Sequence, residues 1–264
     1  MNVPCNSMLA LLVTAMALAG CGRAGSDDVM RSVRPTATAP NARLGNGNHN
    51  GGGPPASLPF DQAQFASSVD NPYFPLVPGT VLSYFDGIEA EQVVVERGTK
   101  KILGVATTIV HDQVFVDGLL TEDTFDWYAQ DLEGNVWYFG EDTKELDHGV
   151  VVSTEGSWEA GVNGATAGII MLADPQVGNR YYQEFAPKVA VDLAKVISLD
   201  GSACVPYGTP DFCSDQLLVT RETSQLDPAV VENKYYASGI GFIRAEIVKG
   251  GDEFTELVQI GKCR

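Results

Sequence analysis

The feature that most constrains the fold is an alternation of apolar and polar residues with a period of two, broken repeatedly at Gly and Asp corners. Asp86-Gly87 and Asp117-Gly118 are typical of tight turns between paired antiparallel strands. About twelve strands can be placed in this way, most of them next to their expected partners in the chain. The pattern predicts an all-β, mainly antiparallel fold: a single curled meander sheet, as a barrel, half-barrel or sandwich, with at most one or two short helices.

Three segments are less regular. Residues 98–101 and Asp200-Gly201 are expected to be further turns, because glycine there accompanies polar residues. Residues 189–199 fit both helical and strand periodicity, and the turn expected at Asp200-Gly201 favours a strand over their second half. Residues 58–69 are mildly amphipathic and are expected to form a short helix or a docked arm.

The start of the chain has the pattern of an export signal. Residues 8–19 are an apolar run interrupted only by Thr14, which is too short to cross a bilayer and suits a signal-peptide core. The following LAGC at residues 18–21 resembles the lipobox of bacterial lipoproteins, although no Lys or Arg precedes the apolar run. That resemblance implies a signal peptide at residues 1–20 and acyl chains on Cys21, and several chains together anchor a protein stably to a membrane.

Residues 21–57 have the composition of a disordered tether, with the run GNGNHNGGGPP and almost no large apolar side chains. As a flexible coil, residues 22–57 would span roughly 30–35 Å on average. Residues 58–264 are then long enough for one antiparallel β domain with a buried core. We therefore expect a signal peptide, a lipidated tether and one domain, in that order.

The predicted domain is strongly acidic. The chain has 17 basic and 34 acidic residues, which gives a net charge of −17. Four of these basic and two of these acidic residues precede residue 58, so residues 58–264 contain 13 and 32 of them and carry −19. This charge excludes nucleic acid as a partner. It is compatible with cation binding, with a basic partner, or with solubility alone.

Cys204 and Cys213 flank a Pro- and Gly-rich loop in a chain expected to be exported, so we expect them to form a disulfide. Cys263 is then either left over or takes the place of one of the two. The spacing of this pair, with no histidine nearby, does not indicate a zinc site.

All three tryptophans lie within residues 122–161, together with the densest group of acidic residues. Alternation places Asp123, Phe125 and Trp127 on one face of a strand, and Asp126 and Tyr128 on the other. We interpret the first face as the core face, where Asp123 would need a partner or a shifted pKa. The turn at residues 131–135 lacks the spacing of an EF-hand and is better explained as a hairpin.

Two kinds of candidate site follow from this region. Carboxylates could hold a hard cation such as calcium or, with a histidine, act as acid and base. Aromatic side chains could line a concave apolar site. A solvated acidic rim and an ordinary aromatic core would give the same pattern. The metal candidates are Asp123, Asp142, Glu155 and Glu159; the catalytic candidates are Asp126, Glu141 and His148; the ligand-lining candidates are Trp127, Trp137, Trp158, Tyr181 and Tyr182.

The chain has no nucleophile elbow, zinc-protease motif, P-loop or dinucleotide-binding glycine pattern. No cofactor is expected apart from the calcium considered above. The sequence favours a lipid-anchored, non-enzymatic β domain that binds an unidentified ligand or protein partner. Two alternatives stay open: an acidic cation-binding domain, and a hydrolase of envelope polysaccharide that uses paired carboxylates such as Asp126 and Glu141.

Several segments resemble motifs of exported bacterial lipoproteins. NPYFPLVPGT at residues 71–80 resembles their proline-rich opening strand, and KYYASGIGFI at residues 234–243 resembles their closing strand. DWYAQDLEGNVWYFGED at residues 126–142 and GSWEAG at residues 156–161 are similar to a narrower, uncharacterised group. The resemblance implies a curved antiparallel sheet shared with lipoprotein carriers, and it implies no activity. By analogy with enteric sorting, Gly22 implies anchoring in the outer membrane, facing the periplasm or the cell surface.

Overall fold

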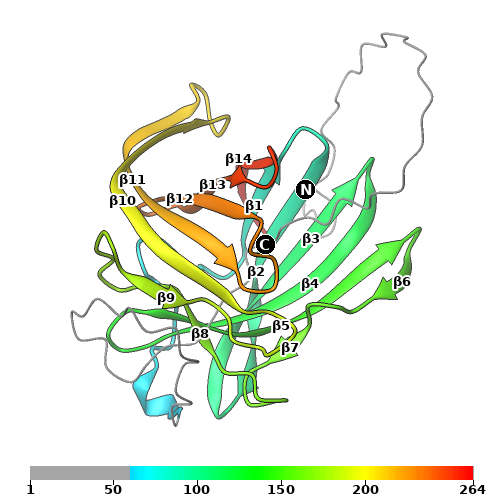
Figure 1. Ribbon diagram of the computed structural model, residues 1–264, viewed down its shortest axis with the longest axis vertical. Helices are drawn as coiled ribbons and strands as arrows, with labels where there is room; N and C mark the ends of the chain where they lie inside the picture. The colour runs from blue at the N-terminus through cyan, green and yellow to red at the C-terminus, as the bar shows by residue number, and fades with distance from the viewer. Residues whose placement is uncertain (1–59, 264) are drawn as a thin grey trace.

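The chain folds into a sheet protein with almost no helix, which confirms the predicted class (Figure 1). The structure is a computed structural model and describes residues 60–263. Within that range, the helical content is one 3₁₀ turn at Gln62–Gln64, and no helix is long and apolar enough to cross a membrane. The strands are β1 (Thr80–Phe85), β2 (Glu89–Ile102), β3 (Val105–Val116), β4 (Leu119–Gln130), β5 (Val136–Asp147), β6 (Val150–Ser153), β7 (Trp158–Glu159), β8 (Gly168–Met171), β9 (Arg180–Tyr182), β10 (Asp192–Val205), β11 (Phe212–Ser224), β12 (Val231–Ala237), β13 (Gly241–Lys249) and β14 (Phe254–Lys262).

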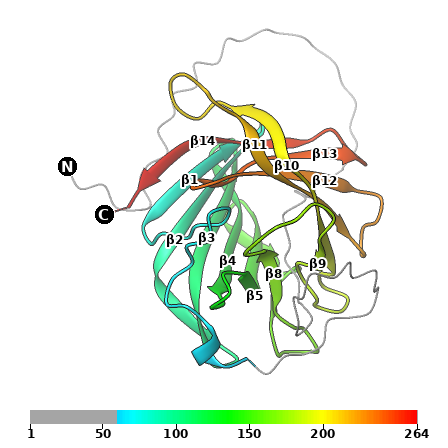
Figure 2. The ribbon, with the colours of Figure 1, turned by 90° about the vertical axis from the view of Figure 1, so that its left-hand side faces the viewer.

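These strands form one curled sheet that does not close on itself. Its hydrogen-bonded order is β6-β5-β4-β3-β2-β1-β14-β13-β12-β11-β10-β9, and β7 and β8 both pair with β5. Most strands therefore pair with their neighbours in sequence, as the turn pattern predicted. The sheet bends so strongly that β10–β13, in yellow and orange, arch over the green strands β3–β5 (Figure 2).

Besides β7 and β8, the first and last strands also depart from this sequential order, because they pair with each other. In the antiparallel β1–β14 pair, Thr80 lies opposite Lys262 and Phe85 lies opposite Glu256. The backbone N–H of Cys263 also donates a 2.8 Å hydrogen bond to the carbonyl oxygen of Gly79, just before β1. The two halves of the sheet, β2–β8 and β9–β13, are thus joined through strands from opposite ends of the domain.

The predicted hairpin corners between β1 and β2 and between β3 and β4 are confirmed. Asp117 and Gly118 both have positive φ angles, 50° and 77°, which a tight hairpin turn requires of its two central residues. At the first corner, the Asp86 carboxylate accepts hydrogen bonds from the backbone N–H groups of Ile88 and Glu89, at 2.7 and 2.5 Å. Asp therefore favours a corner here because its side chain satisfies the turn's own amides.

Two other predicted turns are wrong. Residues 98–101 lie inside β2, and Asp200-Gly201 lies inside β10. At both places the strand pairing shifts register, so the extra residues form irregularities in a continuous strand. A Cβ atom on Gly201 would lie 2.3 Å from Cγ2 of Val219, so only glycine allows the two strands to approach this closely. Glycine beside polar residues can mark a bulge as well as a turn.

The described part of residues 58–69 docks on the sheet, which is one of the two expected alternatives, and it contains the 3₁₀ turn. Residues 60–79 are here called the N-terminal arm. Phe60 packs edge-on against Trp137, with ring centroids 5.4 Å apart, and Phe65 forms a β-bridge with Asp131. Further along, Phe74 packs edge-on against Tyr128 at 5.2 Å. Aromatic contacts therefore fix the arm to β4 and β5, next to the interior of the curled sheet.

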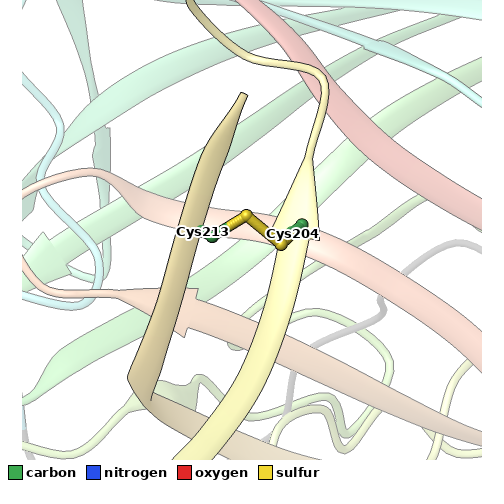
Figure 3. Close-up of a disulfide and its surroundings, with 2 residues drawn as sticks. All are labelled: Cys204 and Cys213. Atoms are coloured by element: carbon green, nitrogen blue, oxygen red, sulfur yellow. A yellow bond between two sulfur atoms is a disulfide. The ribbon is translucent and has the colours of Figure 1, made fainter. Parts of the chain in front are cut away.

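The predicted disulfide between Cys204 and Cys213 is confirmed, with an S–S distance of 2.00 Å (Figure 3). The two residues are paired across β10 and β11, so the bridge connects neighbouring strands rather than distant parts of the fold. Cys263 does not displace either of them, and it is not a free thiol.

The predicted signal peptide, the lipidation site Cys21 and the tether lie outside the described residues.

Candidate functional site

A cavity of about 410 Å³ lies on the concave side of the curled sheet. One wall comes from β1–β4 and the other from β12–β14, and the N-terminal arm and Ile170 of β8 complete it. Most of the lining side chains are apolar, and cavities of this size are typical of sites for small organic ligands. The interior of the half-barrel is thus not filled by the core.

The end of the cavity at the N-terminal arm is closed by buried apolar groups. Leu76 and Tyr128 are each 8% exposed there, and Tyr236 is 2% exposed. The arm lies directly against the sheet: a Cβ atom on Gly241 would be 3.3 Å from Cδ of Pro75. An occupant would therefore meet apolar surface at this end.

The opposite end, near the β1–β2 corner and the start of β14, is open and mixed in character. Phe85, Ile88 and Phe254 line it and are 42, 68 and 40% exposed. Asp86 and Glu253 lie among them. The cavity therefore changes from closed and apolar at one end to open and acidic at the other.

A buried group on one wall, here called the tyrosine cluster, consists of Asp126, Tyr138 and Glu141. The Tyr138 hydroxyl lies 2.5 Å from Oδ1 of Asp126 and 3.1 Å from Oε2 of Glu141. Burial, followed by the charges of Asp126 and Glu141, raises the pKa of Tyr138 well above its ordinary value, so this hydroxyl keeps its proton. Tyr138 also stacks on Tyr128, with ring centroids 4.6 Å apart.

Two of the three catalytic candidates thus lie together. Asp126 and Glu141 are cross-strand partners on β4 and β5, but they are only 8 and 5% exposed, and both contact the Tyr138 hydroxyl. Of the two, Asp126 lines the cavity. The third candidate, His148, is in the corner between β5 and β6, where its side chain is 82% exposed and 3.9 Å from Asp147. The structure therefore does not bring His148 to the carboxylate pair.

The other wall buries a group that we call the lysine cluster: Glu222, Glu232 and Lys234. Nζ of Lys234 lies 2.8 Å from Oε2 of Glu222 and 3.1 Å from Oε2 of Glu232, and the lysine side chain is 1% exposed. Thr220 donates a 2.7 Å hydrogen bond to Glu222. Glu232, Lys234 and Tyr236 line the cavity, because alternate residues of β12 face the same side.

The charges of the lysine cluster depend on one another. Burial alone would lower the pKa of Lys234, but the carboxylates of Glu222 and Glu232 outweigh it and raise this pKa above 10.5. For Glu232, burial raises the pKa above its ordinary value although the ammonium of Lys234 lowers it. The lysine is therefore a firmly charged group whose charge is already neutralised within the wall.

Asp123 does not lie in the core, so our interpretation of its face of β4 is wrong at that position. Its side chain is 24% exposed and accepts hydrogen bonds from Gln113, at 3.0 Å, and pairs with Nε2 of His111 at 2.7 Å. The neighbouring Thr124, on the opposite face, is 0% exposed, and the Asp123 face becomes buried only further along β4, at Trp127. Which face of a strand is concave is decided by the bending of the whole sheet, and alternation cannot reveal it.

The remaining metal candidates are dispersed. Asp142 pairs with Lys144 at 2.9 Å, Glu159 pairs with Lys100 at 2.7 Å, and Glu155 is exposed. No three His, Cys, Asp or Glu side chains within residues 60–263 are grouped so that they could hold a metal ion. Calcium binding thus gains no support from this arrangement.

The five aromatic candidates do not line the cavity. Trp127 has Nζ of Lys100 3.2 Å above its ring, and Trp137 donates a 2.7 Å hydrogen bond to Oδ2 of Asp131. Trp158 packs edge-on against Tyr138, Tyr181 is buried, and Tyr182 packs against Phe185. These side chains belong to the packed layers around the cavity.

The aromatic residues that do face the cavity come from segments far apart in the chain. Tyr84 on β1 and Phe242 on β13 have ring centroids 5.2 Å apart, and the Tyr84 hydroxyl donates a 3.0 Å hydrogen bond to the Phe242 carbonyl. Alternation in β4 places Tyr128 on the opposite face from Trp127, and this is the sequence signal for its position. No local signal connects Tyr84 with Phe242, because only the β1–β14–β13 pairing brings them together.

Comparison with known proteins gives two solved structures with low structural similarity, and no family. No family model matches the chain, and no curated protein matches it. A candidate lipoprotein of Parabacteroides distasonis aligns with 72% of this chain and 98% of its own, at 13% identity and a TM-score of 0.40. A candidate exported protein with a YmcC-like fold from Bacteroides fragilis aligns with 72% of this chain and 99% of its own, at 10% identity and a TM-score of 0.38. At these values the similarity assigns neither a family nor a function to the chain.

Proposed function

We propose that this chain is a non-enzymatic, lipid-anchored protein of the cell envelope that binds a small apolar or amphipathic molecule in the concave cavity. The observation that carries the proposal is the cavity itself: about 410 Å³, lined mainly by apolar side chains from both halves of the sheet. Apolar lining combined with a few polar groups is the usual composition of a ligand site.

The use of the buried carboxylates supports binding rather than hydrolysis. Asp126 and Glu141 both contact the hydroxyl of Tyr138 and are almost inaccessible, whereas a glycosidase needs its two carboxyl groups on either side of a substrate bond. The polar atoms of the lysine cluster are likewise engaged with one another. Both clusters act as parts of the walls around an apolar space.

The proposed location rests on the sequence. Acyl chains on Cys21 would hold the chain at a membrane, with the outer membrane favoured by Gly22, and a tether of roughly 30–35 Å would let the domain move above the surface. A membrane-bound carrier or receptor for a poorly soluble molecule would benefit from this arrangement, because its ligand partitions into the same membrane.

Binding of a neutral dye tests the proposed function. Phenylnaphthylamine fluoresces in apolar surroundings, and we expect the purified chain to bind it saturably. Ala245 lines the cavity and is 5% exposed, so Ala245→Phe places a ring in the space and is expected to weaken dye binding by about tenfold or more. The matched control is Ala106→Phe at an exposed position of β3, with unchanged binding.

Thermal melting of both variants separates lost binding from lost folding. If Ala245→Phe does not fold, Thr255→Phe at the open end provides a second obstruction of the same cavity. A wild-type chain that does not bind the dye, or a folded variant that binds it undiminished, would contradict the proposed function.

A further inference from the structure

The lining of the cavity has a strong charge bias. Of the described residues that line it, Lys234 is basic and seven are acidic. Resting on the proposed function, we propose that the occupant is an amphiphile with an apolar body and a positively charged head group, an amine or a quaternary ammonium. The acidic lining residues are Asp86, Glu89, Glu91, Asp112, Asp126, Glu232 and Glu253.

The one lining lysine does not provide a site for an anionic head group. Lys234 is 1% exposed and lies within 3.1 Å of both Glu222 and Glu232. Two carboxylates therefore already surround its ammonium group, and an incoming carboxylate or phosphate would meet their negative charge together with the positive charge of the lysine. A fatty acid or an anionic phospholipid thus has no cationic partner among the described lining residues, while six acidic residues outside the lysine cluster line the same cavity.

The bias is directional, which indicates how the occupant lies. The closed end presents Leu76, Tyr128 and Tyr236, whereas the open end presents Asp86 and Glu253 beside exposed apolar side chains. An amphiphile that enters with its apolar part first would bury that part against the N-terminal arm. Its head group would then remain at the acidic, partly hydrated end, where a charge costs least to accommodate.

Aromatic rings stand next to these carboxylates. Tyr84 lies directly opposite Glu91 across the β1–β2 pair, and its ring is 5.2 Å from that of Phe242. Phe85 and Phe254 lie further toward the opening. Aromatic faces beside carboxylates favour organic cations over inorganic ones, because the rings attract the charge and also bury the attached alkyl groups.

The overall field acts in the same direction. The chain carries a net charge of −17, and a concave surface of one sign concentrates counter-ions and repels ions of like charge. This long-range effect reaches any ligand that approaches the opening. We therefore expect selectivity by charge even among molecules that have identical apolar parts.

Three amphiphiles with the same dodecyl chain test the inference: dodecyltrimethylammonium, dodecyl maltoside and dodecyl sulfate, each below its critical micelle concentration. In calorimetric titrations of the purified chain, or by displacement of the neutral dye, we expect the cation to bind about tenfold or more tightly than the sulfate. Raising the salt concentration should reduce the ratio of the affinities for the cation and the sulfate, because mobile ions screen partly exposed charges.

A charge variant ties the selectivity to the cavity. Glu91→Gln removes one lining carboxylate with almost no change in shape, and we expect it to reduce the preference for the cation over the maltoside about fivefold. The matched control, Glu133→Gln, removes an exposed carboxylate from the β4–β5 corner and should leave that preference unchanged.

The outcomes separate this inference from the proposed function. If neither the neutral dye nor any of the three amphiphiles binds, the cavity is not a ligand site and both proposals fail. If the dye binds but the cationic amphiphile does not, only the inference fails. If the maltoside binds and the sulfate binds as tightly as the cation, the cavity is a ligand site without the charge selectivity inferred here. Equal loss of selectivity in Glu91→Gln and Glu133→Gln would place its origin in the net charge rather than in the lining, and would overturn the inference.

Discussion

The two walls of the cavity bury carboxylates in opposite ways. The tyrosine cluster on β4 and β5 brings two carboxylates to one neutral hydroxyl, whereas the lysine cluster on β11 and β12 surrounds an ammonium group with two carboxylates. The first cluster depends on hydrogen bonds to a neutral donor, and the second on opposite charges that cancel. Equal numbers of buried acids therefore do not imply equal contributions to stability, because the cost of losing the central group depends on its charge.

The largest loss of stability, measured as the free energy of unfolding, is expected from Lys234→Met. The substitution keeps the apolar stem but leaves Glu222 and Glu232 buried without their ammonium partner. Breaking a buried ion pair in this way costs about 3–5 kcal/mol of the free energy of unfolding. Urea denaturation at pH 7 measures it, and Lys249→Met at an exposed position of β13 is the matched control, expected within about 0.5 kcal/mol of the wild type.

The pH dependence sharpens this prediction. The pKa of Lys234 is raised above 10.5 in the folded chain, so its contribution is fully present below pH 10.5 and is lost as the pH rises through the folded-state pKa. Lys234→Met should lack this alkaline loss. The loss of free energy of unfolding caused by Lys234→Met should also become smaller on acidification. The pKa of Glu232 is already raised by burial and rises further without the lysine, so this carboxylate becomes neutral as the pH falls. A deficit below about 1 kcal/mol at pH 7 would show that the two clusters do not differ as proposed.

A smaller effect is expected from Tyr138→Phe in the tyrosine cluster. The change removes a neutral donor from Asp126 and Glu141 and preserves the stacking on Tyr128. Loss of a hydrogen-bond partner from buried polar groups costs about 1–3 kcal/mol, again measurable by urea denaturation. Tyr182→Phe, whose hydroxyl accepts a hydrogen bond from the exposed Gln225, should cost less than about 0.5 kcal/mol. A larger loss for Tyr138→Phe than for Lys234→Met would reverse the comparison.

The smallest effect is expected outside the walls, at Asp123→Asn. The Asp123–His111 pair is 2.7 Å long, but its side chains are 24 and 16% exposed. The two partly exposed side chains share one hydrogen bond, and such a bond contributes about 0.5–1.5 kcal/mol. A double-mutant cycle with His111→Gln isolates the contribution of this pair. A coupling energy above about 2 kcal/mol would contradict the predicted ranking, in which the most exposed group contributes least to stability.

The fold was largely predictable, because strand alternation and turn residues are local properties of the chain. Asp117-Gly118 marked a corner, and the Cys204–Cys213 pair was correct. The errors lie where two structures share one local signal. Gly201 suits a turn as well as a bulge, and only the packing of β10 against β11, where a Cβ atom on Gly201 would lie 2.3 Å from Cγ2 of Val219, decides between them.

Little of the candidate site could be predicted. The alternation in β4 separated Asp123 from Asp126 correctly, but the concave face is chosen by the curvature of all the strands together. The cavity also depends on residues that meet only through long-range pairing, such as Tyr84 and Phe242. The tryptophans were candidates because of their large aromatic rings, yet such side chains more often fill a protein core than line a cavity.

The pairing of β1 with β14 has a consequence for how the protein is made. Synthesis proceeds from the N-terminus, so the β1–β14 pairing in the middle of the sheet cannot form until β14, the nine-residue last strand, has left the ribosome. A chain cut short before Phe254 would lose the link between its halves rather than an edge. In such a chain β1 and β13 would both become edge strands with unpaired backbone groups, and these edges could pair with other truncated chains.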